Sequence, residues 1–188
     1  MRKFAPLLAA AFLLTGCSNA ASPDGGGTFA FHSPGGQTEI FYDAAERKPI
    51  QDFGGETLTG EQISLSDFAG QVVVLNAWGQ WCAPCRAEVD DLEQIQEELT
   101  SRGTGTVLGI NVRDPNPQIA LDFLKDNGVT YPSIYDPPFK TAAYLGGVPS
   151  SVIPTTIVLD AQHRPAAVFL RQVTAEDVLG VVEKLEAE

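Results

Sequence analysis

The most reactive side chains of the sequence are two cysteines, Cys82 and Cys85, in the segment WCAPC at residues 81–85. Two cysteines at this spacing, on the first turn of a helix, can close a small disulfide and reopen it. Free N–H groups and the dipole at a helix N-terminus favour the thiolate of the first cysteine. That thiolate can attack a disulfide sulfur, and the second cysteine can then resolve the mixed disulfide. We therefore predict that Cys82 is the exposed attacking residue and that Cys85 is the resolving residue.

Two other interpretations of the cysteine pair are a purely structural disulfide and half of a zinc site. A zinc site needs about four ligands, and the sequence offers one further cysteine, Cys17, and two histidines, His32 and His163. A structural disulfide that closes so short a loop constrains little of the unfolded chain. These counts favour redox chemistry by the two thiols themselves, with no bound cofactor and no metal.

The elements that position the two cysteines follow from hydrophobic periodicity. Residues 71–77 form a continuous apolar run, which is typical of a central strand buried on both faces. Residues 83–101 carry apolar side chains at helical spacing, so the cysteine pair is expected at a strand-to-helix junction. Further strands are expected at 106–112, 131–135, 155–159 and 166–170, and further helical segments at 118–127, 140–145 and 175–186.

The connections between these elements indicate the architecture. A short link at 160–164 favours an antiparallel pair of the two strands that it joins. Two β-prone runs at 29–31 and 39–42, around a Pro-Gly turn, predict an N-terminal β-hairpin, and a second hairpin is expected over 57–65 with its turn near Gly60. This order predicts an α/β fold with a mixed central sheet flanked by helices on both faces.

The third cysteine, Cys17, follows a pattern typical of exported proteins. Two cations precede an apolar run at residues 4–14, which is too short to span a bilayer and has the length of a signal sequence. The tetrapeptide LTGC at its end resembles the lipobox of bacterial lipoproteins, which implies cleavage before Cys17 and lipidation of its thiol. The alternative is an ordinary cleaved signal peptide in which Cys17 is incidental. We predict a lipoprotein signal peptide at residues 1–16 and a lipidated flexible tether at residues 17–27.

The charge of the chain restricts its partners. The 188 residues include 24 acidic and 12 basic side chains, which gives a formal net charge of -12 at pH 7. Such a charge disfavours nonspecific binding to nucleic acid or to anionic headgroups, so we expect no nucleic-acid partner. Membrane attachment would then depend on the lipid at Cys17.

The segment LNAWGQWCAPCRAE at residues 75–88 strongly resembles the active-site stretch of thioredoxin-like proteins of the TlpA/ResA type. The resemblance extends from about residue 51 to the end of the chain, and the motif IPTT at 153–156 matches the second landmark of that family. The chain also resembles the actinobacterial cytochrome c maturation thioredoxins called CcsX. The resemblance implies a thioredoxin fold, here in a domain at residues 28–188 whose N-terminal extension is residues 28–49.

The same resemblance implies a function and a location. A protein of this type is a thiol–disulfide oxidoreductase, anchored by lipid on the extracytoplasmic face of the cell membrane. It exchanges disulfides with apocytochrome c and keeps the haem-binding thiols reduced, and its electrons come from a CcdA-type membrane protein. Two alternatives remain open at this point: a general thiol oxidant for exported proteins, and a copper- or haem-binding chaperone that uses the two thiols as ligands.

The resemblance also assigns residues around the cysteines. Pro154 corresponds to the cis-proline that faces the CxxC pair, and its alternative is a trans-proline at the start of a strand. A cis-proline there would expose the backbone of Ile153 for strand-like pairing with a substrate peptide. Trp81 is expected to flank the disulfide, partly exposed, as a contact for partners, whereas Trp78 is expected in the core.

Glu88 lies one helical turn after Cys85 and on the same side of the helix. In ResA-like proteins a glutamate at this position sits by the active site and affects thiol protonation. The resemblance therefore makes Glu88 a candidate proton acceptor for Cys85, or a brake on thiolate formation through like-charge repulsion. The alternative is a solvated surface acid. Asn76 stands where thioredoxin has a buried aspartate, which makes Glu88 the nearer acid.

Overall fold

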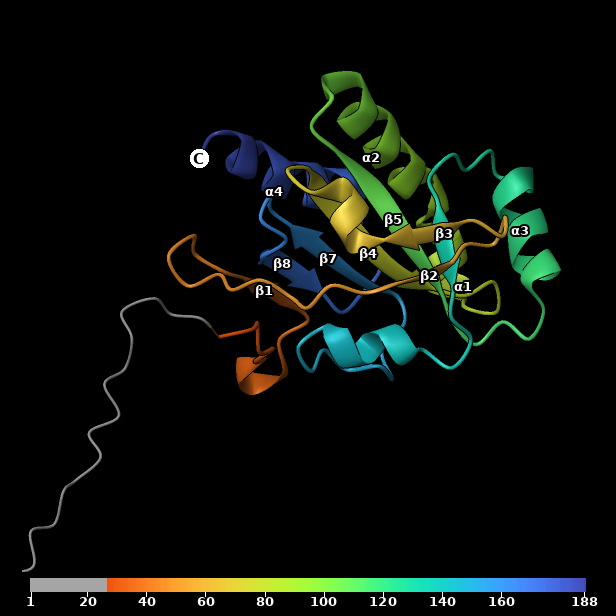
Figure 1. Ribbon diagram of the computed structural model, residues 1–188, viewed down its shortest axis with the longest axis horizontal. Helices are drawn as coiled ribbons and strands as arrows, with labels where there is room; N and C mark the ends of the chain where they lie inside the picture. The colour runs from red at the N-terminus through yellow and green to blue at the C-terminus, as the bar shows by residue number, and fades with distance from the viewer. Residues whose placement is uncertain (1–26) are drawn as a thin grey trace, which may run out of the picture.

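The computed structural model describes residues 27–188 of the chain. The predicted signal peptide at 1–16, Cys17 and all but the last residue of the predicted tether lie outside the described residues. The described part folds around a six-stranded mixed sheet with the strand order β1-β8-β7-β4-β5-β6 (Figure 1). The strands span Glu39–Phe41 (β1), Val72–Trp78 (β4), Gly105–Asn111 (β5), Ser133–Tyr135 (β6), Thr155–Leu159 (β7) and Pro165–Phe169 (β8).

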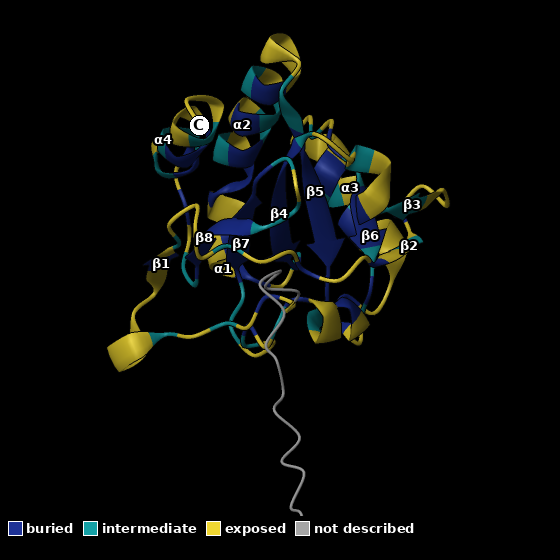
Figure 2. Ribbon diagram, turned by 60° about the vertical axis from the view of Figure 1, so that its left-hand side comes forward, coloured by how far each residue is buried: buried dark blue, intermediate teal, exposed yellow. Residues whose placement is uncertain are grey.

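The centre of the sheet is the strand that leads into the cysteine pair. Strand β4 is buried at all seven positions, as its apolar run predicted, and pairs in parallel with β5 and antiparallel with β7. Leu75 faces a core that includes Phe53 and Leu145, while Val74 faces the helices on the opposite side. Figure 2 shows β4 and β5 enclosed between these layers. The strand is therefore held from both faces, and its carboxyl end is a rigid platform for the site.

Helices cover one face of the sheet more completely than the other. The α-helices span Ala83–Ala87 (α1), Val89–Arg102 (α2), Pro117–Asp126 (α3) and Ala175–Glu186 (α4). Helices α2 and α4 pack side by side on one face, whereas the opposite face is covered by the N-terminal segment and by η3 (Lys140–Tyr144) (Figures 1 and 2). A capping box at Thr174 and Asp177 begins α4 at the residue that the sequence predicted. In the part of the chain that the structure describes, no helix combines the length and apolar character needed to cross a membrane.

The predicted N-terminal β-hairpin does not form. Strand β1 pairs antiparallel with β8, with Ile40 opposite Val168, and not with the run at residues 29–31. That run instead crosses the domain, where the N–H of Phe29 donates to the carbonyl of Pro49 and the N–H of Phe31 to that of Gly146. The prediction was wrong because each apolar run finds a partner remote in sequence, which local pattern does not reveal.

The second hairpin was predicted correctly but begins earlier than expected. Strands β2 (Gly54–Glu56) and β3 (Gln62–Ser64) pair antiparallel as a separate two-stranded sheet. Gly60 adopts a φ of 87° in the turn between them, a conformation that glycine reaches without steric cost.

The long helix predicted over residues 83–101 is divided into α1 and α2 at Glu88. The N–H of Glu88 still donates to the carbonyl of Pro84, and its own carbonyl accepts from Leu92. The chain therefore continues in the same general direction, with φ of -97° and ψ of -1° at the junction. At this junction the Glu88 side chain points into the protein, where it becomes part of the active site.

Candidate active site

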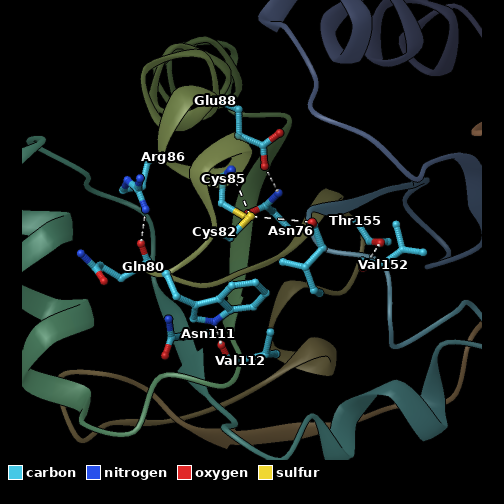
Figure 3. Close-up of a disulfide and its surroundings, with 12 residues drawn as sticks. Asn76, Gln80, Cys82, Cys85, Arg86, Glu88, Asn111, Val112, Val152 and Thr155 are labelled. Carbon is cyan, nitrogen blue, oxygen red and sulfur yellow. Dashed lines mark hydrogen bonds between the residues drawn. A yellow bond between two sulfur atoms is a disulfide. The ribbon is translucent and has the colours of Figure 1, made fainter.

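Cys82 and Cys85 form a disulfide at the point where β4 leads into α1 (Figure 3). Cys82 is the N-cap residue of α1, and its sulfur accepts a hydrogen bond of 3.2 Å from the N–H of Cys85. Pro84 lies in the first turn, where its missing N–H leaves no helical hydrogen bond unmade. This is the arrangement predicted from the spacing: the first sulfur is directed at free N–H groups of a helix start.

The expectation that Cys82 is exposed is wrong for the oxidised protein. Cys82 and Cys85 are each 3% exposed, and both belong to a cluster with Trp78 and Leu124. The cause is tertiary packing, since Ile153 also packs against this cluster and its carbonyl oxygen lies 3.7 Å from the Cys82 sulfur. Asymmetry between the two sulfurs therefore comes from their hydrogen-bonding surroundings and not from their exposure.

The segment that carries Ile153 approaches the disulfide from β7. The Ile153–Pro154 peptide bond is cis, as the resemblance implied. The hydroxyl of Thr155 donates to the carbonyl of Val152 at 2.8 Å, which closes the turn before the strand (Figure 3). Pro154 itself is buried, whereas Ile153 is half-buried beside the sulfur.

The two tryptophans lie as expected. Trp78 is 4% exposed, and its indole N–H donates to the Ser133 hydroxyl at 2.8 Å. Trp81 is 44% exposed beside the disulfide, and its indole N–H donates to the carbonyl of Val112 at 3.0 Å. An exposed ring fixed by one hydrogen bond suits contact with a macromolecular partner.

Glu88 is fully buried, so the surface-acid interpretation is wrong. One carboxylate oxygen accepts a hydrogen bond of 2.9 Å from the side-chain amide of Asn76 (Figure 3). The other oxygen accepts a hydrogen bond of 2.9 Å from the N–H of Val173. Burial raises the pKa of Glu88 from 4.5 to about 7, and these two hydrogen bonds oppose that rise. The carboxyl group can therefore gain or lose a proton near neutral pH.

Asn76 links Glu88 to the neighbouring strand. Its amide group also donates to the hydroxyl of Thr156 on β7 at 3.0 Å. Its carbonyl oxygen is buried without a hydrogen-bond partner among the described residues. Within this contact, Glu88 therefore supplies the carboxyl group and Asn76 supplies a neutral amide.

A second buried carboxylate, Asp114, was missed by the sequence reasoning. It is 1% exposed and accepts hydrogen bonds from the N–H of Gln80 at 2.8 Å and from the amide of Asn111 at 2.7 Å. It therefore ties the loop before the cysteines to the end of β5. Its position just after β5 could have indicated this role, because the carboxyl ends of parallel strands such as β4 and β5 meet at the same edge of a sheet.

The described residues, 27–188, contain no group of three or more histidine, cysteine, aspartate or glutamate side chains that could hold a metal ion. The chemical centre is thus a buried disulfide at a helix start, with a carboxyl group that titrates near neutral pH and an exposed tryptophan. The profile of the AhpC/TSA family matches residues 47–164, which include all of these groups. The chain belongs to the AhpC/TSA family.

Two solved structures and one curated relative are similar to this chain over most of its length. A DsbF homologue from Corynebacterium diphtheriae is 66% identical, with a TM-score of 0.81 over 84% of this chain and 99% of that one. A secreted thiol-disulfide isomerase from Corynebacterium glutamicum is 68% identical, with a TM-score of 0.84 over 87% of this chain and 100% of that one. The thiol-disulfide oxidoreductase ResA of Bacillus subtilis is 29% identical over 131 residues, which are 69% of this chain and 70% of ResA.

These relatives confirm the resemblance to the TlpA/ResA type and the thioredoxin fold. The matched stretch covers between 65% and 77% of the length of the curated relatives. The Cys82–Cys85 disulfide and the names of these relatives both indicate thiol–disulfide exchange. This member of the AhpC/TSA family is a thiol–disulfide oxidoreductase.

Proposed function

We propose that this chain is a lipid-anchored oxidoreductase outside the cytoplasm that reduces the haem-binding thiols of apocytochrome c. It would receive its electrons from a CcdA-type membrane protein. The observation that carries the direction of electron flow is the environment of the Cys82 sulfur, which offers a thiolate little stabilisation. Support for the pathway comes from the resemblance to ResA and to the CcsX group, and support for the location comes from the lipobox at Cys17 and a close relative described as secreted.

A disulfide is a strong oxidant when the dithiol that forms on its reduction is stabilised, above all through the thiolate. The sulfur of Cys82 accepts one N–H bond, from Cys85, and faces the carbonyl oxygen of Ile153 at 3.7 Å. A carbonyl oxygen accepts a hydrogen bond from a thiol and repels a thiolate. The buried residues that cluster with Cys82 are apolar, and Glu88 adds a negative charge when it is ionised. Such surroundings give the thiolate little stabilisation, which favours a reductant.

The proposed reaction assigns a role to each side chain. The Cys82 thiolate attacks a substrate disulfide, and one substrate sulfur leaves as a thiolate that takes a proton from water. Glu88 accepts the proton of Cys85, whose thiolate then attacks the Cys82 sulfur and releases the second substrate sulfur as a thiolate, which takes up the proton held by Glu88. The two cysteines thereby lose two electrons, and the substrate gains them. Ile153 offers its backbone, next to Pro154, to the substrate chain, and Trp81 contacts the same partner.

The reduction potential tests the direction of transfer. Equilibration of the purified chain with dithiothreitol or glutathione buffers should place it near thioredoxin, at about -270 mV, and far from the strong oxidant DsbA, at about -120 mV. A value close to that of DsbA would contradict a reducing function.

The partner is tested by a trap. Cys85→Ser leaves Cys82 without a resolving thiol, so a mixed disulfide with the substrate should accumulate. Cys82→Ser is the matched control, because it removes the attacking sulfur and should capture nothing. We expect c-type apocytochromes in the trap and a loss of haem-stained cytochromes in a deletion strain. Normal cytochromes in that strain would refute the pathway.

The anchor is tested separately from the chemistry. Cys17→Ala should release the protein from the membrane fraction and leave the reduction potential of the purified protein unchanged. Retention of the variant on membranes would refute a lipid anchor at Cys17.

A second candidate function is general disulfide exchange in exported proteins. It is favoured by the names of two relatives that are 66% and 68% identical, a DsbF homologue and a secreted thiol-disulfide isomerase. This function predicts that the Cys85→Ser trap captures many exported proteins. It also predicts reduced or scrambled exported proteins, with intact cytochromes, in the deletion strain.

A further inference from the structure

Two arginines at the active site differ from the other arginines of the described chain. The chain has twice as many acidic as basic side chains, and ion pairs with carboxylates are correspondingly common. Four arginines of residues 27–188 pair with carboxylates: Arg47, Arg102, Arg164 and Arg171. Arg86 and Arg113 form no such pair with any described carboxylate, and both are exposed.

Both of these arginines are attached to the backbone around the disulfide. Arg86 donates at 2.8 Å to the carbonyl of Gln80, two residues before Cys82 (Figure 3). Arg113 donates at 2.7 Å to the carbonyl of Ser150, in the loop that leads to Ile153. Each guanidinium has five N–H groups, so most of its donors remain for an incoming group.

Arg113 also fixes the exposed tryptophan. Its guanidinium carbon lies 5.6 Å from the ring centroid of Trp81, at cation–π distance. Its backbone has a φ of 59°, in a region that side chains other than glycine seldom adopt. Its N–H donates to the carbonyl of Pro137 at 3.0 Å, which holds that conformation. The guanidinium group of Arg113 is thus held between the Trp81 ring and the carbonyl of Ser150.

The acid nearest in sequence to Arg113 does not neutralise the charge that these two arginines present to a partner. Asp114 is 1% exposed, and its carboxylate is directed inward to Gln80 and Asn111. A docked chain therefore meets the two guanidinium groups and not the carboxylate of Asp114.

We propose that Arg86 and Arg113 form a cationic rim that selects substrate segments with a carboxylate beside the reactive cysteine. This rests on the proposed function, disulfide exchange at Cys82. Two unit charges about 4 Å apart under water-like screening change a binding constant about fivefold, and planar guanidinium groups bind carboxylates with two hydrogen bonds. The rim acts on substrate binding, so it changes the half-saturating concentration and not the limiting rate.

The test uses the reduced full chain and three disulfide-linked peptides whose cysteine is flanked by Asp, Ser or Lys. In each turnover, the Cys82–Cys85 dithiol passes two electrons and two protons to the peptide disulfide and releases two peptide thiols. Single-turnover rates at several peptide concentrations give the half-saturating concentration and the limiting rate. We expect the Asp peptide to half-saturate at about a fivefold lower concentration than the Ser peptide, and the preference to shrink at high salt.

Variants separate the rim from general effects of charge. Arg113→Gln and Arg86→Gln should each reduce the preference for the Asp peptide, while Arg113→Lys keeps the charge and most of the preference. Arg102→Gln is the matched control, because it removes one positive charge at the far end of α2 and should leave the preference intact. Equal half-saturating concentrations for the three peptides would overturn the proposal that the rim selects a carboxylate. An unchanged preference in the Arg86→Gln, Arg113→Gln double variant would overturn it as well. A failure of all three peptides to oxidise the chain would instead refute the proposed function.

Discussion

The buried carboxyl group of Glu88 makes the stability of the folded chain depend on pH. Its pKa is raised from 4.5 to about 7, chiefly by burial. Between these two values the folded chain holds a proton that the unfolded chain has lost, so stability falls as pH rises. With these pKa values, the free energy of unfolding drops by about 2 to 3 kcal/mol between pH 5 and pH 8 through this one group.

The variant Glu88→Gln removes this dependence, because an amide resembles the protonated acid at every pH in the range. It keeps an acceptor for the N–H of Val173, but its NH2 group faces the amide of Asn76, which must turn over to offer its unpartnered oxygen. Any cost of that rearrangement is the same at both pH values. The difference in unfolding free energy between variant and wild type should therefore shift by about 2 to 3 kcal/mol in favour of the variant from pH 5 to pH 8.

Denaturant unfolding of the oxidised proteins at pH 5 and pH 8 measures both differences. Glu97→Gln is the matched control, since it makes the same formal change at an exposed position of the same helix. Between pH 5 and pH 8, its difference from wild type in unfolding free energy should change by less than about 0.5 kcal/mol. A Glu88→Gln variant that keeps the pH dependence of the wild type would refute the assignment of that dependence to Glu88.

Three further substitutions have expected outcomes that denaturant curves can check. Asp114→Ala leaves one buried and one part-buried donor without their acceptor and should cost about 2–3 kcal/mol; a cost below that of a typical surface substitution would contradict its role as a tie between loops. Thr174→Ala removes the capping box of α4 and should cost about 1 kcal/mol, with no effect on the reduction potential. Gly109→Ala places a methyl group against the Ser133 hydroxyl and near the indole of Trp78, so it should destabilise the chain and alter Trp78 fluorescence; unchanged fluorescence would argue against this contact.

Local signals in the sequence sufficed for the elements that carry the site. The apolar run at 71–77 predicts β4 because a strand buried on both faces needs no alternation, and the cap at Thr174 predicts the start of α4. The pairing of β1 could not be predicted in this way. Its partner, β8, lies more than a hundred residues later, so the pairing depends on which sheet edge the folded domain leaves open.

The site shows the same division between local and tertiary information. The position of Cys82 at a helix start and the cis bond before Pro154 followed from motifs. The burial of Cys82 did not, because it depends on Ile153 from a loop some 70 residues away. Glu88 was ambiguous for a similar reason: helical spacing places it on the side of Cys85 but does not say whether other elements cover that side.

The acidic residues near the start of α2 are better understood as acceptors for remote segments than as a solvated face. Glu88 accepts from the N–H of Val173, and Asp91 accepts from the N–H of Ala175 at 2.9 Å. Glu93 accepts from both the N–H and the hydroxyl of Thr130. Hydrogen bonds to charged groups contribute about 1.5–3 kcal/mol each. The only disulfide of residues 27–188 must open during catalysis, so it cannot be a permanent link. These hydrogen bonds, together with the apolar contacts of α2 with α4, hold the helix that follows the cysteines against α4 and the approach to β6.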